Sequence, residues 1–271
     1  MAMARQMDKA VPGNAWQRAA LRLFLATCLA ALAGCASLRI TEPAYLALSP
    51  QAALQLVNDS AVQTPLVVTA KIEIRHFGKR YPSRAALMIQ QPDRLRFESI
   101  PPLGPPNFFL SIDQEELAVF VPAQNVFYRG RATETNISRF LHLALPPTDL
   151  ISLLLGQPPE GKGLLRGSWD AELYRVDREG EGERSDAFWL NPAERRLVRW
   201  QRLGKEDRVV MTVDFADPAP TGKGIIPRGL TLNTEGVTLA VHYTELVPTR
   251  GEDETIFALP LPEGFTAESL D

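Results

Sequence analysis

The sequence has little of what most catalytic and metal sites are built from. Its 271 residues include only two cysteines and three histidines. His76, His142 and His242 form no HExxH pattern and no pair spaced four residues apart, and no GxSxG nucleophile elbow or phosphate-binding glycine loop occurs. The acidic residues are scattered over positions that we expect to face solvent. We therefore predict that the protein is not an enzyme and needs no metal and no cofactor.

An excess of positive charge is also missing. The 29 Lys and Arg residues are balanced by 32 Asp and Glu residues, which gives a net charge of -3. This composition lacks the general electrostatic footprint of a nucleic-acid-binding protein. The sequence does have many prolines, 22 in all. Because proline disrupts helix interiors, a loop-rich, mainly β architecture is favoured.

The longest uncharged apolar run, residues 23–32, is too short to cross about 30 Å of hydrocarbon as a helix. It follows a basic segment and fits the apolar region of an export signal. It ends in Leu32-Ala33-Gly34-Cys35, which resembles a bacterial lipobox. We predict that residues 1–34 are removed, that Cys35 carries the lipid anchor, and that residues 35–49 form a tether. The alternative is an ordinary signal peptide that contains a cysteine by chance.

Two consequences follow from this signal. Cys28 leaves with the signal and Cys35 is capped by lipid, so no disulfide forms within one mature chain. Ala36, rather than an aspartate, follows the acylated cysteine. By resemblance to the sorting rules of Gram-negative bacteria, this favours an outer-membrane location facing the periplasm.

The remainder, residues 50–271, reads as one domain. Ser49-Pro50 and the apolar stripe that follows predict a helix over residues 50–59. From Leu66 the apolar period changes to two, and about ten to eleven short strands with short turns predict an antiparallel sheet that curls. The charged segment 177–186 is expected to be a solvated loop, and the tail after Tyr243 is expected to be irregular.

A second helix is predicted over Leu150–Leu155, opened by Thr148-Asp149 and ended by Gly156, and it is apolar around most of its circumference. Such a helix favours burial on all sides, so we expect it to plug or cover something concave. Its apolar residues are Leu150, Ile151, Leu153, Leu154 and Leu155.

A proline-rich connection, Ile100–Pro106, carries a large apolar side chain, Leu103, between two strands. The prolines restrict φ and Gly104 permits a tight turn. One interpretation is a rigid finger that offers an apolar tip to a membrane or a partner. The other is that Leu103 folds back onto the sheet.

The order of these features resembles the LolB family of outer-membrane lipoprotein receptors, within the LolA/LolB fold. The resemblance rests on an ordered series of features: the lipobox, the N-terminal helix, the strand pair at Leu66–Gln91, Asp93–Phe97, Pro102-Leu103-Gly104, Leu145–Pro147, Leu150 and Leu154–Pro158. It implies a half-open antiparallel β-barrel with helices on the concave side. It also implies an apolar cavity for the acyl chains of lipoproteins, which a soluble LolA-like periplasmic carrier delivers. Pro102, Leu103 and Gly104 match the loop that the family uses for insertion into the membrane.

On this basis we predict that the protein binds acylated lipoproteins and helps to insert them into the outer membrane. The second predicted helix would be the lid of the cavity. The predicted cavity walls are apolar strand residues: Ile72, Ile74, Leu87, Ile89, Leu95, Phe97, Leu110, Val119, Trp200, Met211 and Val213. Strand parity cannot separate a cavity wall from a solid core, so both interpretations stay open. Other hypotheses are a structural envelope lipoprotein that docks a partner, a carrier of another hydrophobic ligand, and a lipid-modifying hydrolase.

Overall fold

The structure is a computed structural model that describes residues 48–101, 103–180, 184–249 and 254–271. These residues belong to one compact unit, Ala47–Asp271. The predicted signal segment, the predicted lipid-attachment site Cys35, most of the predicted tether and Pro102 lie outside the described residues.

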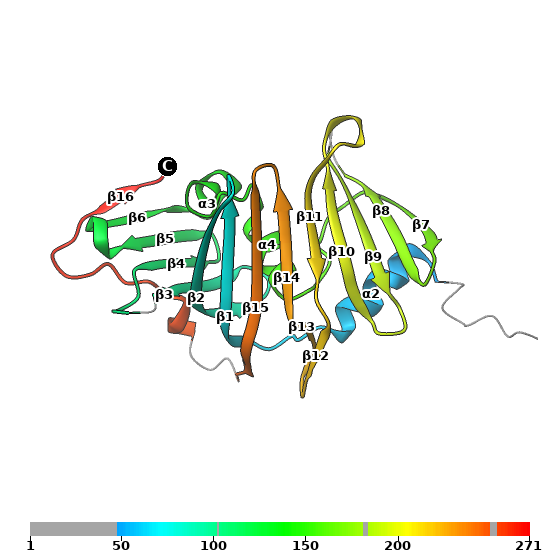
Figure 1. Cartoon of the computed structure of the whole chain (residues 1–271), viewed down its shortest axis with the longest axis horizontal. Coiled ribbons are helices and arrows are strands. Elements are labelled where there is room, and N and C mark those ends of the chain that lie inside the picture. Colours follow the sequence, from blue (N-terminus) through cyan, green and yellow to red (C-terminus); the bar gives the residue numbers. More distant parts are fainter. Residues whose placement is uncertain (1–47, 102, 181–183, 250–253) are drawn as a thin grey trace, which may run out of the picture. The chain divides into compact units, whose positions relative to one another are not determined.

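One large sheet of fourteen strands dominates this unit (Figure 1). The spatial order is β16-β6-β5-β4-β3-β2-β1-β15-β14-β11-β10-β9-β8-β7. Neighbours are antiparallel, except that β16 pairs in parallel with β6. The first half of the chain supplies β1 Leu66–His76, β2 Lys79–Gln90, β3 Arg94–Ile100, β4 Phe108–Asp113, β5 Glu116–Val121 and β6 Val126–Arg131.

The second half of the chain extends the sheet on the far side of β1, except that its last strand, β16, lies at the opposite edge beside β6. It supplies β7 Leu164–Asp170, β8 Leu173–Glu179, β9 Ser185–Asn191, β10 Arg196–Leu203, β11 Val209–Phe215, β14 Gly229–Thr234, β15 Val237–Pro248 and β16 Ala267–Ser269. A separate two-stranded sheet joins β12 Pro218–Thr221 to β13 Gly224–Pro227. Short 3-10 turns occur at Pro122–Gln124, Lys205–Asp207 and Glu254–Phe257.

The described residues form three α-helices. In α2, Pro50–Ser60, the Ser49 hydroxyl accepts a hydrogen bond from the amide of Ala52 at 3.2 Å and caps the helix, which confirms the start predicted from Ser49-Pro50. The second predicted helix is also confirmed, as α4, Pro147–Leu154. The helix α3, Glu134–Leu141, was not predicted, because it is only eight residues long and its apolar stripe is brief.

The helices cover the face of the sheet to which the alternating apolar residues point. Val68, Ala70 and Ile72 of β1 are buried on this face, while Lys71 on the opposite face is exposed. All of the apolar residues of α4 are buried, as expected for a helix that is apolar all round. The core therefore lies between one face of the sheet and the three helices.

The prediction of a mainly β fold with a large antiparallel sheet is confirmed, but ten to eleven strands are too few. Three of the additional strands are β6, the parallel edge strand β16, and one that arises because a turn at Ala171 divides a predicted strand into β7 and β8. The sheet is not closed, since β16 and β7 are its two edges. The prediction that segment 177–186 is a solvated loop is wrong at its ends, where Arg178 and Asp186 lie in strands and are buried.

In the part of the chain that the structure describes, no helix is both long enough and apolar enough to pass through a bilayer.

Candidate functional site

A cavity of about 460 Å³ lies between the inner face of the sheet and the helices α3 and α4. This volume is within the range of small-molecule sites, about 300–1,000 Å³. Its lining is mostly apolar and comes from β1 to β4, β15, the end of α3 and α4. The lining side chains are Ile72, Ile74, His76, Tyr81, Pro82, Ser83, Leu87, Leu95, Phe97, Ser99, Phe108, Leu110, Phe140, Leu141, His142, Leu143, Leu150, Leu154, Val237, Leu239 and Val241.

Six of the eleven predicted wall residues line this cavity: Ile72, Ile74, Leu87, Leu95, Phe97 and Leu110. The other five do not, and they are packed in the core instead: Ile89, Val119, Trp200, Met211 and Val213. Strand parity left open whether these residues line a cavity or fill a solid core. The structure shows that six of them do the first and five the second.

Strand pairing brings the wall residues together. Ile72 lies opposite Val241 and Ile74 lies opposite Leu239 across the β1–β15 pair. On the other side of β1, Phe97 of β3 pairs with both Leu87 of β2 and Leu110 of β4. Because directly opposed side chains on one face are about 5 Å apart, each set of pairs forms an apolar patch of the wall.

The cavity is open at the end where β1 joins β2. Leu110 is fully buried, whereas Ile74 and Tyr81 are 40% and 51% exposed. Polar groups gather toward this end: the rings of His76 and His142 are 6.4 Å apart, and the hydroxyls of Ser83 and Ser99 are 3.1 Å apart. The site therefore combines an apolar interior with a more polar mouth.

Two of the predicted lid residues, Leu150 and Leu154, form the side of the cavity opposite the sheet. They are one turn apart on α4 and so share a helix face. Ile151, Leu153 and Leu155 are buried elsewhere in the core. The lining residues Phe140–Leu143 were missed by the sequence analysis, because α3 was not predicted.

The C-terminal end of α4 is fastened to the sheet. The buried Tyr243 hydroxyl of β15 donates a hydrogen bond to the carbonyl of Leu154 at 2.6 Å, and burial raises the pKa of this phenol. Gly156, which follows the helix, has a φ of +73°, and a Cβ there would lie 2.5 Å from Pro227 Cδ. Only glycine satisfies both constraints at this position.

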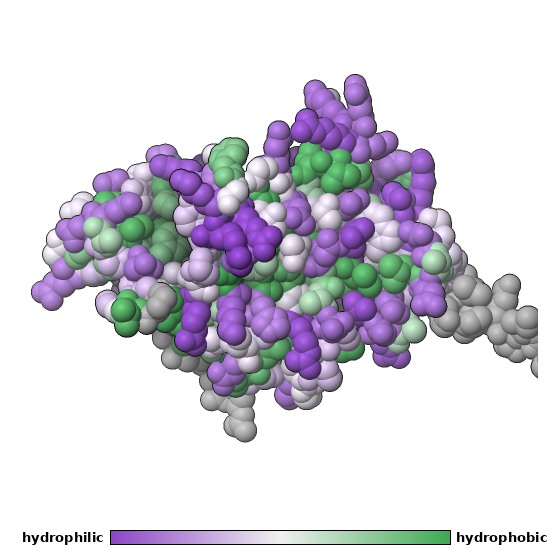
Figure 2. Space-filling view, in the orientation of Figure 1, coloured by the Kyte–Doolittle hydropathy of each residue, from purple (hydrophilic) through white to green (hydrophobic). Residues whose placement is uncertain are grey.

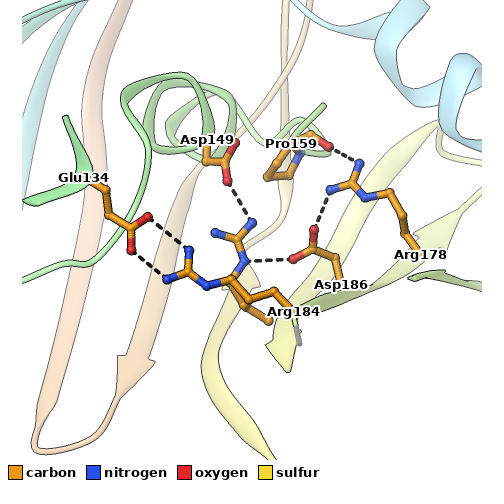
Figure 3. Close-up of polar contacts among 7 residues, drawn as sticks. Glu134, Asp149, Pro159, Arg178, Arg184 and Asp186 are labelled. Carbon is orange, nitrogen blue, oxygen red and sulfur yellow. Dashed lines mark hydrogen bonds and ion pairs between the residues drawn. The ribbon is translucent and has the colours of Figure 1, made fainter. Parts of the chain in front are cut away.

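The N-terminal end of α4 is held by a buried ionic network (Figure 3). The Arg202 guanidinium of β10 donates to Asp149 of α4 at 2.8 Å and to Asp186 of β9 at 3.0 Å. Arg178 of β8 donates to Asp186 and, at 2.8 Å, to the carbonyl of Pro159. All four charged side chains are at most 10% exposed.

Burial and pairing act against each other in this network. Burial raises the pKa of the Asp149 carboxyl, and the hydrogen bond from Arg202 offsets only part of that effect. Burial lowers the pKa of Arg202, but the ion pairs with Asp186 and Asp149 outweigh it and raise the pKa overall. The sequence offered no signal for this network, since its members are far apart in the chain.

The predicted insertion loop borders the cavity. Ser99 and Phe108, which flank the loop, both line it. Leu103 is 91% exposed, so it does not fold back onto the sheet, and nothing lies within 4 Å of a Cβ placed on Gly104. The loop therefore presents an isolated apolar side chain to its surroundings.

Among the residues that the structure describes, no group of three His, Cys, Asp or Glu side chains is arranged to hold a metal ion. No family model matches the sequence, and no curated protein matches it either.

Several solved structures share the fold at low sequence identity. A DUF1329 family protein from Desulfovibrio piger has a TM-score of 0.60 and 15% identity, over 78% of this chain and 98% of its own. A domain from Vibrio parahaemolyticus named for outer membrane lipoprotein sorting has a TM-score of 0.57 and 14% identity, over 77% of this chain and 97% of its own.

A LolA superfamily protein from Nitrosomonas europaea has a TM-score of 0.58 and 14% identity, over 79% of this chain and 99% of its own. Identities this low show similarity of fold alone. The part of the chain that the structure describes thus has the LolA/LolB fold, shared with DUF1329 and LolA-superfamily proteins.

Proposed function

We propose that this protein is a lipid-anchored receptor that takes the acyl chains of lipoproteins into its cavity and helps to insert them into the outer membrane. The observation that carries the proposal is the open, apolar cavity of about 460 Å³ beside the exposed Leu103 loop. The fold shared with LolA-superfamily proteins supports the same role.

Acyl chains need such a hollow because each CH₂ group that leaves an apolar environment costs about 0.8 kcal/mol. The walls offer branched aliphatic and aromatic side chains, which contact a hydrocarbon without requiring directed hydrogen bonds. The polar groups at the mouth suit the more polar end of a lipidated molecule. The role requires no chemical step, because the membrane is the better final solvent for the chains.

The anchor and the location belong to the same proposal. Acylation at Cys35 attaches the protein to the periplasmic side of the outer membrane, and a soluble LolA-like carrier delivers the cargo. The Leu103 loop then enters the bilayer surface and opens a path for the acyl chains. The anchor holds the protein at one membrane, and the cavity lies beside an apolar tip. Both features suit the delivery of acyl chains from water to that membrane.

The first experiment tests uptake with residues 36–271, which contain the whole compact unit 47–271. We expect a diacylated peptide or a fluorescent fatty acid to bind at micromolar concentration. Val241→Phe fills the cavity and should weaken binding at least tenfold, while Val247→Phe, on the same strand but 45% exposed, should not. Absence of binding by the unaltered chain would contradict the proposal and favour a structural role.

The second experiment separates uptake from delivery. Leu103→Glu should bind the peptide normally but fail to transfer it to vesicles, because a charge at the tip resists entry into the bilayer. Leu164→Glu is the matched control, since Leu164 is 58% exposed on the edge strand β7. Equal transfer by Leu103→Glu and the unaltered chain would remove the loop from the mechanism.

A further inference from the structure

A second exposed apolar tip stands at the mouth of the cavity, in the hairpin between β1 and β2. Phe77 is 83% exposed at the turn. His76 and Tyr81, on either side of the turn, both line the cavity, and the His76 ring lies 4.3 Å from the Phe77 ring between centroids. Figure 2 shows a hydrophobic cap at the upper end of these strands, above a hydrophilic surface.

The local backbone gives no folding reason for a phenylalanine at this place. Phe77 has a φ of +46° and Gly78 a φ of +75°, so both central residues of the two-residue turn are left-handed. Such turns favour Asn-Gly or Asp-Gly, and an aromatic side chain in this region costs about 1–2 kcal/mol. Asparagine would stabilise this turn more than phenylalanine does. The phenylalanine therefore suggests a role in a contact outside the protein.

The charge around this tip is opposite in sign to that of the whole chain. Residues 73–80 contain three basic side chains, Arg75, Lys79 and Arg80, and one acidic side chain, Glu73. Glu73 pairs with Arg75 and Arg80, so it offsets only one of these positive charges. All three basic residues are exposed.

An aromatic tip within a basic collar matches the chemistry of a membrane surface. Aromatic side chains favour the headgroup level of a bilayer, and basic side chains are attracted to anionic lipid. From these observations we infer that the β1–β2 hairpin is a second contact with the bilayer, in which Phe77 enters the interface and Lys79 and its basic neighbours bind anionic headgroups.

This contact would place the mouth of the cavity on the bilayer. The Leu103 loop and the Phe77 hairpin both border the cavity, one after Ser99 and the other after His76. With the mouth at the interface, a guest could pass between cavity and bilayer with little exposure to water. The contact itself requires no acyl-chain binding and is tested separately from it.

Phe77→Asn makes the sharpest test, because stability and membrane binding should change in opposite directions. The variant of residues 36–271 should melt at the same temperature or higher, since asparagine suits the turn. Its partition onto vesicles of phosphatidylcholine and phosphatidylglycerol, measured by flotation, should fall at least about tenfold, because a Phe side chain no longer leaves water. Phe77→Trp should retain binding, and Leu164→Asn is the control for loss of an exposed apolar residue.

Charge reversal tests the basic collar. Lys79→Glu should lower partition at least about tenfold on the anionic vesicles at low salt, and high salt should reduce the difference. Lys223→Glu makes the same change at the tip of the β12–β13 hairpin and should have little effect. Phosphatidylcholine alone should bind the unaltered chain more weakly.

The inference is overturned if the unaltered chain does not bind anionic vesicles, or if Phe77→Asn and Lys79→Glu bind them as it does. It is also overturned if these variants lose only the capture of a carrier protein. Fatty-acid binding by Phe77→Asn should be unchanged, so failure of the hairpin contact and failure of the proposed cavity are distinguishable.

Discussion

Two regions of one sheet share the same alternating sequence pattern, but one lines a cavity and the other forms a solid core. In the hollow half, β1–β4 with β15, many of the inward side chains face a cavity. In the packed half, β8–β11, the inward side chains meet helices and one another, and Trp200 and Phe188 are fully buried. The comparison shows that the alternation determines which way a side chain points, while the opposing layer determines whether it meets a neighbour.

Side-chain size accounts for much of the difference. In the packed half, the guanidiniums of Arg202 and Arg178 lie over the rings of Trp200 and Phe188, 4.8 and 4.9 Å from the centroids. These large groups fill the space beneath the helices. The hollow half has serines at inward positions, Ser83 and Ser99, which fill less space.

The largest expected effect is in the packed half. Arg202→Ala leaves Asp149 and Asp186 buried without their main partner and should lower the free energy of unfolding by about 3–5 kcal/mol. Arg184→Ala removes an ion pair with Glu134 in which the arginine side chain is 61% exposed. This change should lower the free energy of unfolding by less than about 1 kcal/mol. Urea unfolding measures both, and equal losses would show that the buried network is not what stabilises this half.

An intermediate effect comes from adding the same bulk to each half. Val213→Phe overpacks a fully buried position and should cost about 1–3 kcal/mol. Val241→Phe points the same ring into the cavity and should leave the stability nearly unchanged. Thermal and urea unfolding of the two variants compare the halves directly. A large loss for Val241→Phe would mean that the cavity is filled or collapsed in solution.

The smallest effect concerns the pH dependence of the packed half. Because the folded pKa of Asp149 is raised above its ordinary value of 3.8, the folded chain binds a proton more readily than the unfolded chain. Relative to Asp149→Asn, the unaltered protein should gain stability as the pH falls through the raised folded pKa toward 3.8, and the difference should be level at higher pH. A difference that grows with rising pH would show that pairing with Arg202, and not burial, dominates.

Local sequence patterns predicted the elements that they control directly. Ser49-Pro50 marked the start of α2, the period of two identified most of the strands, and the proline-rich segment marked a stiff connection, although it left open whether Leu103 is exposed or folds back onto the sheet. Each of these depends on neighbours in the chain: a cap, an alternation, or a restricted φ.

Features that depend on distant residues were missed. Arg178 and Asp186 read as part of a solvated loop because the segment between them is charged and rich in glycine. They are buried because β8 and β9 pair and bring them beneath α4, where Arg202 and Pro159 complete their contacts. No local property of residues 177–186 predicts that Arg178 and Asp186 are buried.

By itself, the sequence determined a mainly β fold, the inward face of most strands, two of the helices and a stiff connection that carries Leu103, because these follow from local steric preference and alternating hydrophobicity. Only the tertiary structure decided that half of the inward face encloses a cavity of about 460 Å³ while the other half is solid. The reason is that a cavity depends on the distance between the sheet and the helices that cover it. That distance is set only when the chain has folded.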